Sequence, residues 1–281
     1  THNVSSAASD VYKRQLMKRI ASTQNQAVKN IVALQSKAKA RKETKSFVVE
    51  GLRELQLAFT VGFEAMHIYW CPEILGEVAF KNWIGKFNLD SKITSVSTGV
   101  YRKMVMRDTT EGVVGVLKQK DAKLENWQPK SNCPFVLVLE SIEKPGNLGA
   151  ILRTADAAGV DAVIISDPHT DIYNPNVIRS SVGGFFSVLT FVCENNQAKD
   201  FLKTFNINIY AASLQKGINY ATADFTKATA LVMGSEAKGL SPFWQKETTA
   251  VKIPMLGHVD SLNVSVATAV LAYEVVRQRK S

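Results

Sequence analysis

The feature that most constrains the fold of this chain is a regular alternation of short hydrophobic strands with helices over residues 134–281. The pattern begins with a predicted buried strand at residues 135–139, a helix at 148–158 and a second buried strand at 162–166. Strands that alternate with helices usually pair in parallel through right-handed crossovers. We therefore predict an α/β domain with a mostly parallel sheet, whose ligand site lies beyond the carboxyl ends of the strands. Later strands are predicted at residues 188–192, 207–212, 230–233 and 250–253, and later helices before residue 181 and at 197–205 and 264–277.

The first half of the chain predicts a second, smaller α/β layer. The expected elements are a helix over residues 15–41, a strand at 47–50 that enters a helix at 52–59 through Gly51, strands at 66–70 and 113–117, and a helix at 97–106.

Between the two layers, residues 121–133 are polar, contain Pro129 and show no hydrophobic period. We therefore predict an N-terminal domain over residues 16–120, a linker over 121–133 and a C-terminal domain over 134–281. Residues 1–15 are excluded from the fold prediction, because residues 5–15 resemble a translated sequencing adaptor.

The positive charge of the chain is concentrated in its first half. The formal net charge is +9, and all of the excess falls in residues 1–133, since residues 134–281 carry equal numbers of basic and acidic side chains. Ten Lys and Arg residues lie between Lys13 and Lys45, against the single acid Glu43. Such a density attracts polyanions, and we expect contact with an RNA or DNA backbone. The residues alone leave two alternatives open, a solvated basic tail and, for the Ser-rich start, an organelle transit peptide.

Composition and spacing disfavour several classes of protein. No apolar run approaches the roughly 18 residues needed to cross a bilayer, so we expect no membrane association. The three cysteines lie far apart, which favours a reducing compartment such as the cytoplasm. The four histidines show no ligand spacing, so we expect no metal site. The spacing from Gly234 to Gly239 is not that of a phosphate loop, because Leu240 and Ser241 follow where Lys and Ser or Thr are required.

Three segments place polar residues directly after buried-type strands. The first contains N-x-G-x-x-x-R-T-A, from Asn147 to Ala155. Asn147 is expected to cap the helix that begins there. Arg153 is expected to point away from the apolar stripe of that helix, where it can face a cleft.

The other two segments follow later strands. G-S-E-x-x-G-L-S begins at Gly234, which lets a ligand approach the backbone, and it holds Glu236 at the mouth of its strand. I-P-M-x-G-x-x-x-S-L-N-V-S-x-A begins at Ile253, and its Asn263 is expected to cap a final helix that is apolar over a broad face.

Together the three segments resemble the signature motifs of the SpoU (TrmH-type) branch of the SPOUT RNA methyltransferases. The order of the motifs and their strand contexts agree as well, and the resemblance covers residues 134–281. F-V-V-E-G-L-R at residues 47–53 is similar to the opening of the family's N-terminal substrate-binding domain, a small α/β fold like that of ribosomal proteins that bind kinked RNA. The second motif departs from the family at Ala237, where Gly is common and where an added methyl group could stiffen the loop.

The resemblance implies a C-terminal SPOUT domain with a trefoil knot, S-adenosyl-L-methionine as the cofactor, and methylation of a ribose 2′-hydroxyl in RNA. It also implies a homodimer with the final helix at the interface. Large-subunit rRNA is the expected substrate, because the N-terminal domain resembles that of rRNA-directed members. A tRNA 2′-O-methyltransferase, a resistance methyltransferase and a non-catalytic RNA-binding relative are the alternatives. The implied catalytic residues are Asn147, Arg153, Glu236, Ser261 and Asn263. The implied cofactor-binding residues are Ala212, Gly234, Ile253, Met255 and Leu262.

The role of Arg153 is open between two alternatives. In enzymes of this family the corresponding arginine has been proposed to take the proton of the hydroxyl group. An ordinary guanidinium has a pKa about 6 units above neutrality, so its free base costs roughly 8 kcal/mol. Anchoring of a phosphate, or stabilisation of the developing oxyanion, is the second alternative.

Overall fold

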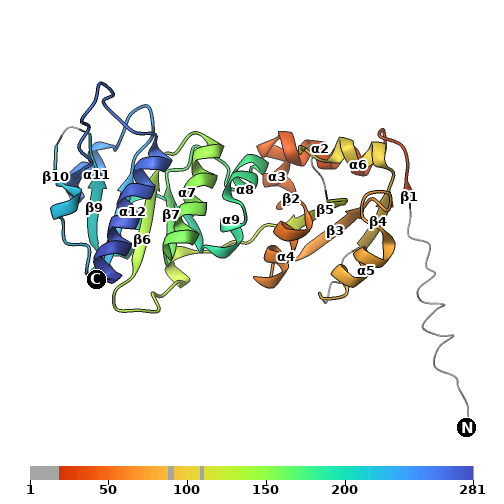
Figure 1. Ribbon diagram of the computed structural model, residues 1–281, viewed down its shortest axis with the longest axis horizontal. Coiled ribbons are helices and arrows are strands. Elements are labelled where there is room, and N and C mark those ends of the chain that lie inside the picture. Colours follow the sequence, from red (N-terminus) through yellow and green to blue (C-terminus); the bar gives the residue numbers. More distant parts are fainter. Residues whose placement is uncertain (1–18, 88–91, 108–110, 215, 281) are drawn as a thin grey trace, which may run out of the picture. The chain divides into compact units, whose positions relative to one another are not determined.

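The computed structural model describes residues 19–87, 92–107, 111–214 and 216–280 (Figure 1). The chain divides into two compact units, residues 1–119 and 120–281. The adaptor-like segment and the first part of the basic run, up to residue 18, lie outside the described residues.

The first unit is built on a mixed sheet with the strand order β1-β4-β3-β5-β2. β4 pairs in parallel with β1 and β3, whereas β5 pairs antiparallel with β3 and β2. The strands are β1 (Arg19–Ile20), β2 (Ser46–Glu50), β3 (Ala65–Trp70), β4 (Lys92–Val96) and β5 (Val113–Lys118). The helices are α2 (Gln26–Ser36), α3 (Ala38–Thr44), α4 (Leu52–Thr60), α5 (Glu77–Ile84) and α6 (Thr98–Met104).

The helices of the first unit cover both faces of its sheet. Figure 1 shows α2, α3 and α6 on one face and α4 and α5 on the other. On the first face, Val28 and Ile31 of α2 and Val100 of α6 pack in one core with Val114 and Val116 of β5. On the second face, the aromatic residues Trp70 of β3 and Phe80 of α5 stack with their ring centroids 4.5 Å apart. The alternation of side chains along each strand produces this division.

The long helix predicted over residues 15–41 is wrong. Asn25 caps α2 by accepting a hydrogen bond from the backbone N–H of Ala27 at 2.9 Å, so the helix begins at Gln26. It ends at Lys37, whose backbone is extended with φ −122° and ψ 114°, and α3 follows. The buried guanidinium of Arg41 donates to the carbonyl oxygens of Leu34 and Gln35, which satisfies the last turn of α2.

The second unit is built on seven strands in the order β10-β12-β9-β11-β6-β7-β8, and every neighbouring pair is parallel. The predicted α/β class with a mostly parallel sheet and a smaller N-terminal α/β domain is confirmed. The strands are β6 (Phe135–Glu140), β7 (Ala162–Ser166), β8 (Thr190–Cys193), β9 (Asn208–Ala212), β10 (Ile218–Asn219), β11 (Thr229–Met233) and β12 (Thr249–Lys252). The helices are α7 (Pro145–Ala158), α8 (Pro175–Ser181), α9 (Gly184–Ser187), α10 (Asn195–Thr204), α11 (Pro242–Glu247) and α12 (Val264–Lys280), with 3-10 turns η1 (Leu124–Asn126) and η2 (Tyr220–Thr222).

Helices cover both faces of this sheet as well. α7 and α12 contact each other on one face, and Figure 1 shows them side by side. On the other face, Leu202 of α10 and Trp244 of α11 pack against Val136, Val138 and Ile164 in one core. A sheet covered in this way opens to ligands only at the ends of its strands.

The segment predicted as a linker packs on the second unit. Leu124 of η1 is buried in the core that α10 covers. The indole of Trp127 stacks on Phe201 with ring centroids 5.3 Å apart. These two apolar residues within a polar stretch hold the segment against the sheet, which the absence of a period in the sequence did not reveal.

Candidate functional site

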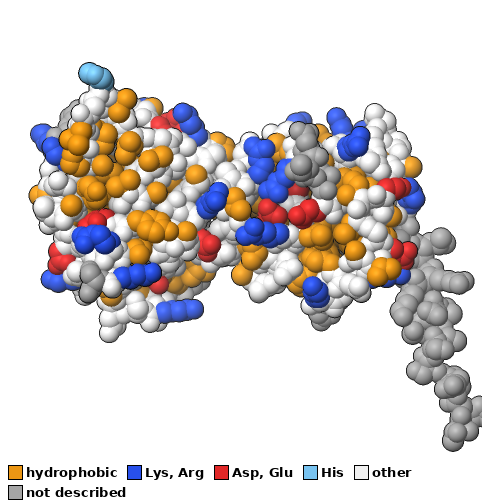
Figure 2. All heavy atoms as spheres, viewed as in Figure 1, with side chains coloured by type: hydrophobic (Ala, Val, Ile, Leu, Met, Phe, Trp, Pro, Cys, Tyr) orange, Lys and Arg blue, Asp and Glu red, His pale blue; other side chains and the backbone are white. Residues whose placement is uncertain are grey.

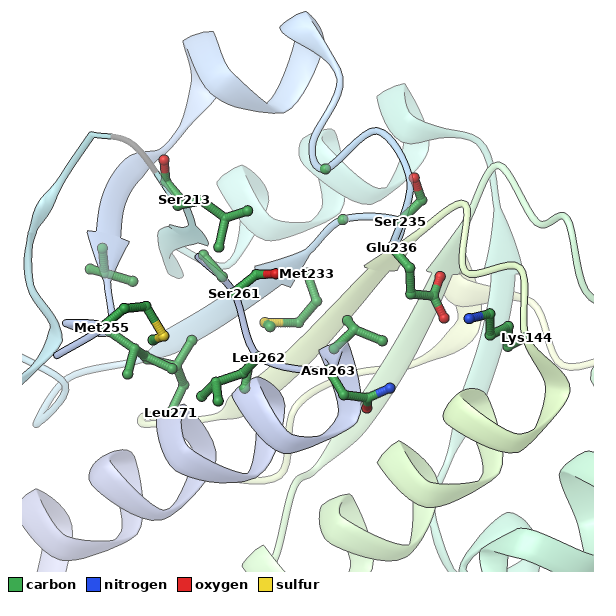
Figure 3. Close-up of a pocket in the computed structure, with 18 residues that line it drawn as sticks. Lys144, Ser213, Met233, Ser235, Glu236, Met255, Ser261, Leu262, Asn263 and Leu271 are labelled. Carbon is green, nitrogen blue, oxygen red and sulfur yellow. The ribbon is translucent and has the colours of Figure 1, made fainter. Parts of the chain in front are cut away.

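A cavity of about 330 Å³ lies at the carboxyl ends of β9, β11 and β12 (Figure 3). This volume is within the range of small-molecule sites. Its position matches the prediction that ligands bind beyond the strand ends of a parallel sheet. The apolar lining consists of Ala212, Leu214, Met233, Val251, Ile253, Met255, Leu262, Val264, Ala267 and Leu271. The polar lining consists of Lys144, Ser213, Ser235, Glu236, Ser261 and Asn263, together with Gly234 and Gly239.

The structure brings all five residues implied for cofactor binding to this one cavity. Ala212 ends β9, Gly234 follows β11, and Ile253 follows β12. Met255 and Leu262 come from the segment between β12 and α12, which closes one side of the cavity. Residues that are far apart in the sequence thus meet because their strands are neighbours in the sheet.

The loop from Gly234 to Ser241 folds back on itself at the edge of the cavity. Two backbone hydrogen bonds join Ser235 and Gly239, at 3.1 and 2.9 Å. A side chain at Gly234 would put its Cβ 2.3 Å from the carbonyl carbon of Gly239, so only glycine allows this close approach. Ala237 is exposed, so its methyl group does not enter the cavity.

Glu140 binds Ser241, the last residue of this loop, and was not among the residues predicted from the sequence. The carboxylate is 3% exposed at the end of β6. It accepts hydrogen bonds from the backbone N–H of Ser241 at 2.8 Å, from its hydroxyl at 2.6 Å, and from the Nδ2 of Asn195 at 3.0 Å. A carboxylate at the end of the buried strand F-V-L-V-L-E was the available signal, because such a group must find partners.

Three of the implied catalytic side chains form a hydrogen-bonded row. The Nδ2 of Asn147 donates to the Oε1 of Glu236, and the Nδ2 of Asn263 donates to the Oδ1 of Asn147 at 3.2 Å. Among the described residues, the buried Oε2 of Glu236 has no hydrogen-bond partner. In Figure 3 the ammonium of Lys144 points toward the Glu236 carboxylate. The row therefore leaves a free acceptor beside the cavity, ready for a donor on a ligand.

The two remaining implied catalytic residues lie differently. Ser261 lines the cavity, and its hydroxyl donates to Asp260 at 3.1 Å. Arg153 is exposed on α7 and is not among the residues that line the cavity. The structure therefore brings Asn147, Glu236, Ser261 and Asn263 together, but not Arg153.

The two predicted helix caps have different outcomes. Asn263 accepts a hydrogen bond from the backbone N–H of Ser265 at 2.9 Å, so it caps α12 as predicted. The cap predicted at Asn147 is wrong, because α7 begins at Pro145 with Lys144 as its first flanking residue. Proline is well suited to the first helical position, which moves Asn147 into the first turn and frees its side chain for Glu236.

The carboxyl edge of the sheet also holds a cysteine, at the end of β8. Burial raises the pKa of the Cys193 thiol to about 11, and the carboxylate of Asp167 acts in the same direction. The thiol is therefore protonated at neutral pH and is a poor nucleophile.

The lining of the cavity fits S-adenosylmethionine. Apolar side chains such as Met233, Ile253 and Leu262 suit a flat aromatic ring, and the exposed backbone at the strand ends offers hydrogen-bonding groups to its edge. The unpartnered Oε2 of Glu236 supplies a negative charge and an acceptor. Within the described ranges, no group of three His, Cys, Asp or Glu side chains is arranged to hold a metal ion. None of the helices that these residues form has the length and apolar content needed to span a bilayer.

Known proteins are similar to this chain over most of its length. The SpoU rRNA Methylase family matches residues 134–273, and the MRM3-like substrate binding domain matches residues 25–115. The 23S rRNA (guanosine(2553)-2'-O)-methyltransferase RlmP of Bacillus subtilis is 30% identical over 270 residues, which cover 92% of this chain and 99% of that protein.

Solved structures give the same result. An RNA 2'-O ribose methyltransferase shares 34% sequence identity and superposes with a TM-score of 0.80, covering 94% of this chain and 100% of that one. The AdoMet-bound rRNA methyltransferase of Sinorhizobium meliloti shares 29% identity with a TM-score of 0.82, covering 92% of this chain and 97% of that one.

Proposed function

The chain belongs to the SpoU rRNA methylase family, and from this we propose that it transfers a methyl group from S-adenosylmethionine to a ribose 2′-hydroxyl of large-subunit rRNA. The observation that carries the proposal is the single cavity at three strand ends, with the row of Asn147, Glu236 and Asn263 at its side. The name of the Bacillus subtilis relative supports the 2′-hydroxyl of 23S rRNA as the acceptor. The MRM3-like domain supports an RNA substrate.

The cofactor is held by Ala212, Gly234 and Ile253 at the strand ends and by Met255 and Leu262 of the segment between β12 and α12. When bound, S-adenosylmethionine supplies a methyl group on a positively charged sulfur. The loop that begins at Gly234 forms one side of the site, where its backbone doubles back so closely that Gly234 and Gly239 meet with no side chain between them. Methyl transfer requires that a hydroxyl oxygen lie in line with that methyl group, so the protein's task is mainly alignment.

The polar side chains align the ribose and manage its proton. The Oε2 of Glu236 accepts a hydrogen bond from the ribose, while Asn147 donates to the other carboxylate oxygen and is itself held by a hydrogen bond from Asn263. The hydroxyl oxygen would bond to the methyl carbon as the bond from that carbon to sulfur breaks with its electron pair on sulfur, and the hydroxyl proton would pass to the Oε2 of Glu236. Ser261 adds a hydroxyl oxygen to the lining of the cavity, while its proton is donated to Asp260. We assign Arg153 the role of an RNA phosphate anchor, because its guanidinium is exposed on α7 and does not line the cavity, so a phosphate group can reach it.

The proposal includes a homodimer through α12. This helix and the segment before it expose Leu256, Val259, Val266 and Tyr273. Figure 2 shows hydrophobic side chains gathered over this part of the second unit. A second copy would cover them, and light scattering at micromolar concentration should give twice the mass of one chain. A monomeric mass would contradict this part of the proposal.

Two finer features complete the proposal. We place the protein in the cytoplasm, where rRNA and reduced cysteines are found together. We also propose that the segment between β12 and α12 threads a trefoil knot. In support, β12 pairs with β9, whereas α12 packs against α7, and α7 follows β6, which lies two positions beyond β9 in the sheet.

A methyl-transfer assay tests the function. Wild-type protein with tritiated S-adenosylmethionine should label an unmodified 23S rRNA transcript, and mapping of 2′-O-methyl sites should give one ribose. Arg153→Ala should lower kcat/KM for RNA about 100-fold, as loss of a charge-assisted phosphate contact does, while the cofactor affinity from calorimetry changes less than twofold. Asp156→Ala, one turn further along α7 and also exposed, is the control. If the wild type labels no RNA, the proposed function is contradicted. If the activity of Arg153→Ala stays within about tenfold of the wild type, the role of Arg153 is contradicted.

A further inference from the structure

A groove of about 260 Å³ runs between α2 and α6 on one face of the first unit. It lies among elements that no catalytic residue uses, and it holds three of the unit's cations. The residues that line it are Thr23, Gln24, Val28, Lys29, Val32, Ala33, Ser36, Lys37 and Lys103. The feature is therefore a basic concave surface with hydroxyl and amide groups at one end.

The sequence of α2 explains why lysines face this groove. Val28, Ile31 and Leu34 form the stripe of α2 that is buried against the sheet. Lys29 begins the neighbouring stripe, with spacings of three, four and seven residues to Val32, Ala33 and Ser36. Lys37 follows the helix, about 12 Å from Lys29 along its axis at 1.5 Å per residue. Lys103 comes from the last turn of α6 and lines the same groove.

The three groove lysines lack the acidic partners that other cations of the unit have. Arg107 pairs with Glu54 at 2.9 Å and Lys118 with Glu64 at 3.2 Å, and Lys81 pairs with Glu77. For Lys29, Lys37 and Lys103 no ion pair forms with any acid in the described part of the chain. The only acid on α2, α3 and α6 is Glu43, which lies 3.8 Å from Lys39. Figure 2 shows Lys and Arg side chains over these three helices.

We infer that the groove between α2 and α6 binds the phosphate backbone of the RNA substrate through Lys29, Lys37 and Lys103. The inference rests on the proposed function and makes it more specific, because it selects one face of the first unit over the face covered by α4 and α5. An anionic backbone matches three uncompensated ammonium groups in a row, and such contacts position RNA without reading its sequence. The hydroxyl of Thr23 and the side-chain amide of Gln24 add neutral polar groups to the same groove.

Basic residues of the first unit differ in whether they line the groove or are buried in the fold, a difference that the net charge does not show. Arg41 belongs to the basic run, yet it is buried and holds the end of α2. Lys103 lies far outside that run, yet it faces the groove. The basic run therefore contributes to RNA binding through selected residues.

Two triple variants of the full chain test the inference. Lys29→Gln, Lys37→Gln and Lys103→Gln together remove the groove charge. Arg53→Gln, Lys81→Gln and Lys86→Gln together remove the same charge from α4, α5 and the turn that follows α5, and serve as the control. Affinity for a 23S rRNA transcript is measured by filter binding between about 50 and 300 mM salt. In this range the affinity of a protein that contacts phosphates falls steeply as the salt concentration rises.

Three lost phosphate contacts should lower the slope of log affinity against log salt by about 2, at roughly 0.7 per contact. At 0.1 M salt this corresponds to an RNA affinity about 100-fold weaker, and to an equally raised KM for RNA. The kcat at saturating RNA and the affinity for S-adenosylmethionine should stay within about twofold of the wild type, because the groove touches neither reactant. The control variant should lose little of either slope or affinity.

A third variant separates loss of charge from loss of fold. Lys29→Arg, Lys37→Arg and Lys103→Arg together keep the charge and should keep most of the RNA affinity. The inference is overturned if the groove variant and the control bind RNA equally, or if the arginine variant fails as fully as the glutamine variant. Absence of methyl transfer by the wild type would count against the proposed function alone, since the binding comparison still decides on the groove.

Discussion

The close packing of α7 on α8 leads to a sharp prediction at Gly149. An added Cβ at this residue would lie 2.4 Å from the carbonyl oxygen of Val177 and 1.9 Å from the hydroxyl oxygen of Ser180. The Ser180 side chain can rotate away, but the Val177 carbonyl belongs to the backbone of α8. Gly149→Ala therefore requires α8 to move by about 1 Å to restore van der Waals contact.

The size of the effect follows from two opposing terms. Forcing an extra carbon into a close-packed interface costs about 3 kcal/mol at the upper end of the usual range. Replacing glycine by alanine in a helix returns about 1 kcal/mol of backbone entropy. The net loss for Gly149→Ala is then about 2 kcal/mol, which lowers the Tm of a domain of this size by about 4–8 °C.

Gly146→Ala in the same helix is the matched control. A Cβ at Gly146 meets no atom within 4 Å, so this variant should gain a few tenths to about 1 kcal/mol from the helix term alone. Thermal and urea unfolding followed by circular dichroism measure both variants. Equal stability of the two would refute the reasoning, because it would mean that α8 yields at no cost.

Two further predictions concern Glu140 and Tyr173. Glu140→Gln leaves one amide oxygen where two carboxylate oxygens accept three hydrogen bonds, so the loop should become less ordered at Ser241. We expect a loss of about 1.5–3 kcal/mol of stability and, in calorimetry, cofactor binding about tenfold weaker. An unchanged cofactor affinity would contradict the role given to Glu140. Burial raises the pKa of Tyr173 to about 12. Its hydroxyl accepts a hydrogen bond from the backbone N–H of Lys120 and donates one to the backbone carbonyl oxygen of Lys120, both at 2.9 Å. The folded protein therefore keeps a proton that the unfolded chain loses near pH 10, so the free energy of unfolding should fall between about pH 10 and 12. The fall should be smaller in Tyr173→Phe. Equal falls for the two proteins, measured by urea unfolding at each pH, would contradict this prediction.

The sequence predicted most of the second unit because each of its buried strands is a continuous apolar run flanked by a helix or a glycine. It failed where elements are short or polar. α5 has eight residues and only Phe80 and Trp83 buried, which is too few to establish a period. β4, with the polar sequence K-I-T-S-V, is placed between β1 and β3 by its neighbours in the sheet.

The site was predictable to the extent that its motifs are local. Gly234, Glu236 and Asn263 lie within motifs, and the structure gathers them at one cavity. The hydrogen bonds of Glu140 to Ser241 join residues far apart in the sequence, so no local pattern revealed them. Pro145, in contrast, was a local signal for the start of α7, and weighing it above Asn147 would have given the correct helix boundary.

The strand order of the second sheet affects how the nascent chain folds. β6 lies inside the sheet next to the central strand β11, but β11 is synthesised only after residues 141–228. At about 5–20 residues per second, one edge of β6 stays unpaired for roughly 4–18 s on the ribosome. Parallel pairing across such a sequence separation is also slow in refolding. During synthesis the second unit should therefore expose the unpaired edge of β6, which is prone to aggregation, and should depend on chaperones until β11 is made.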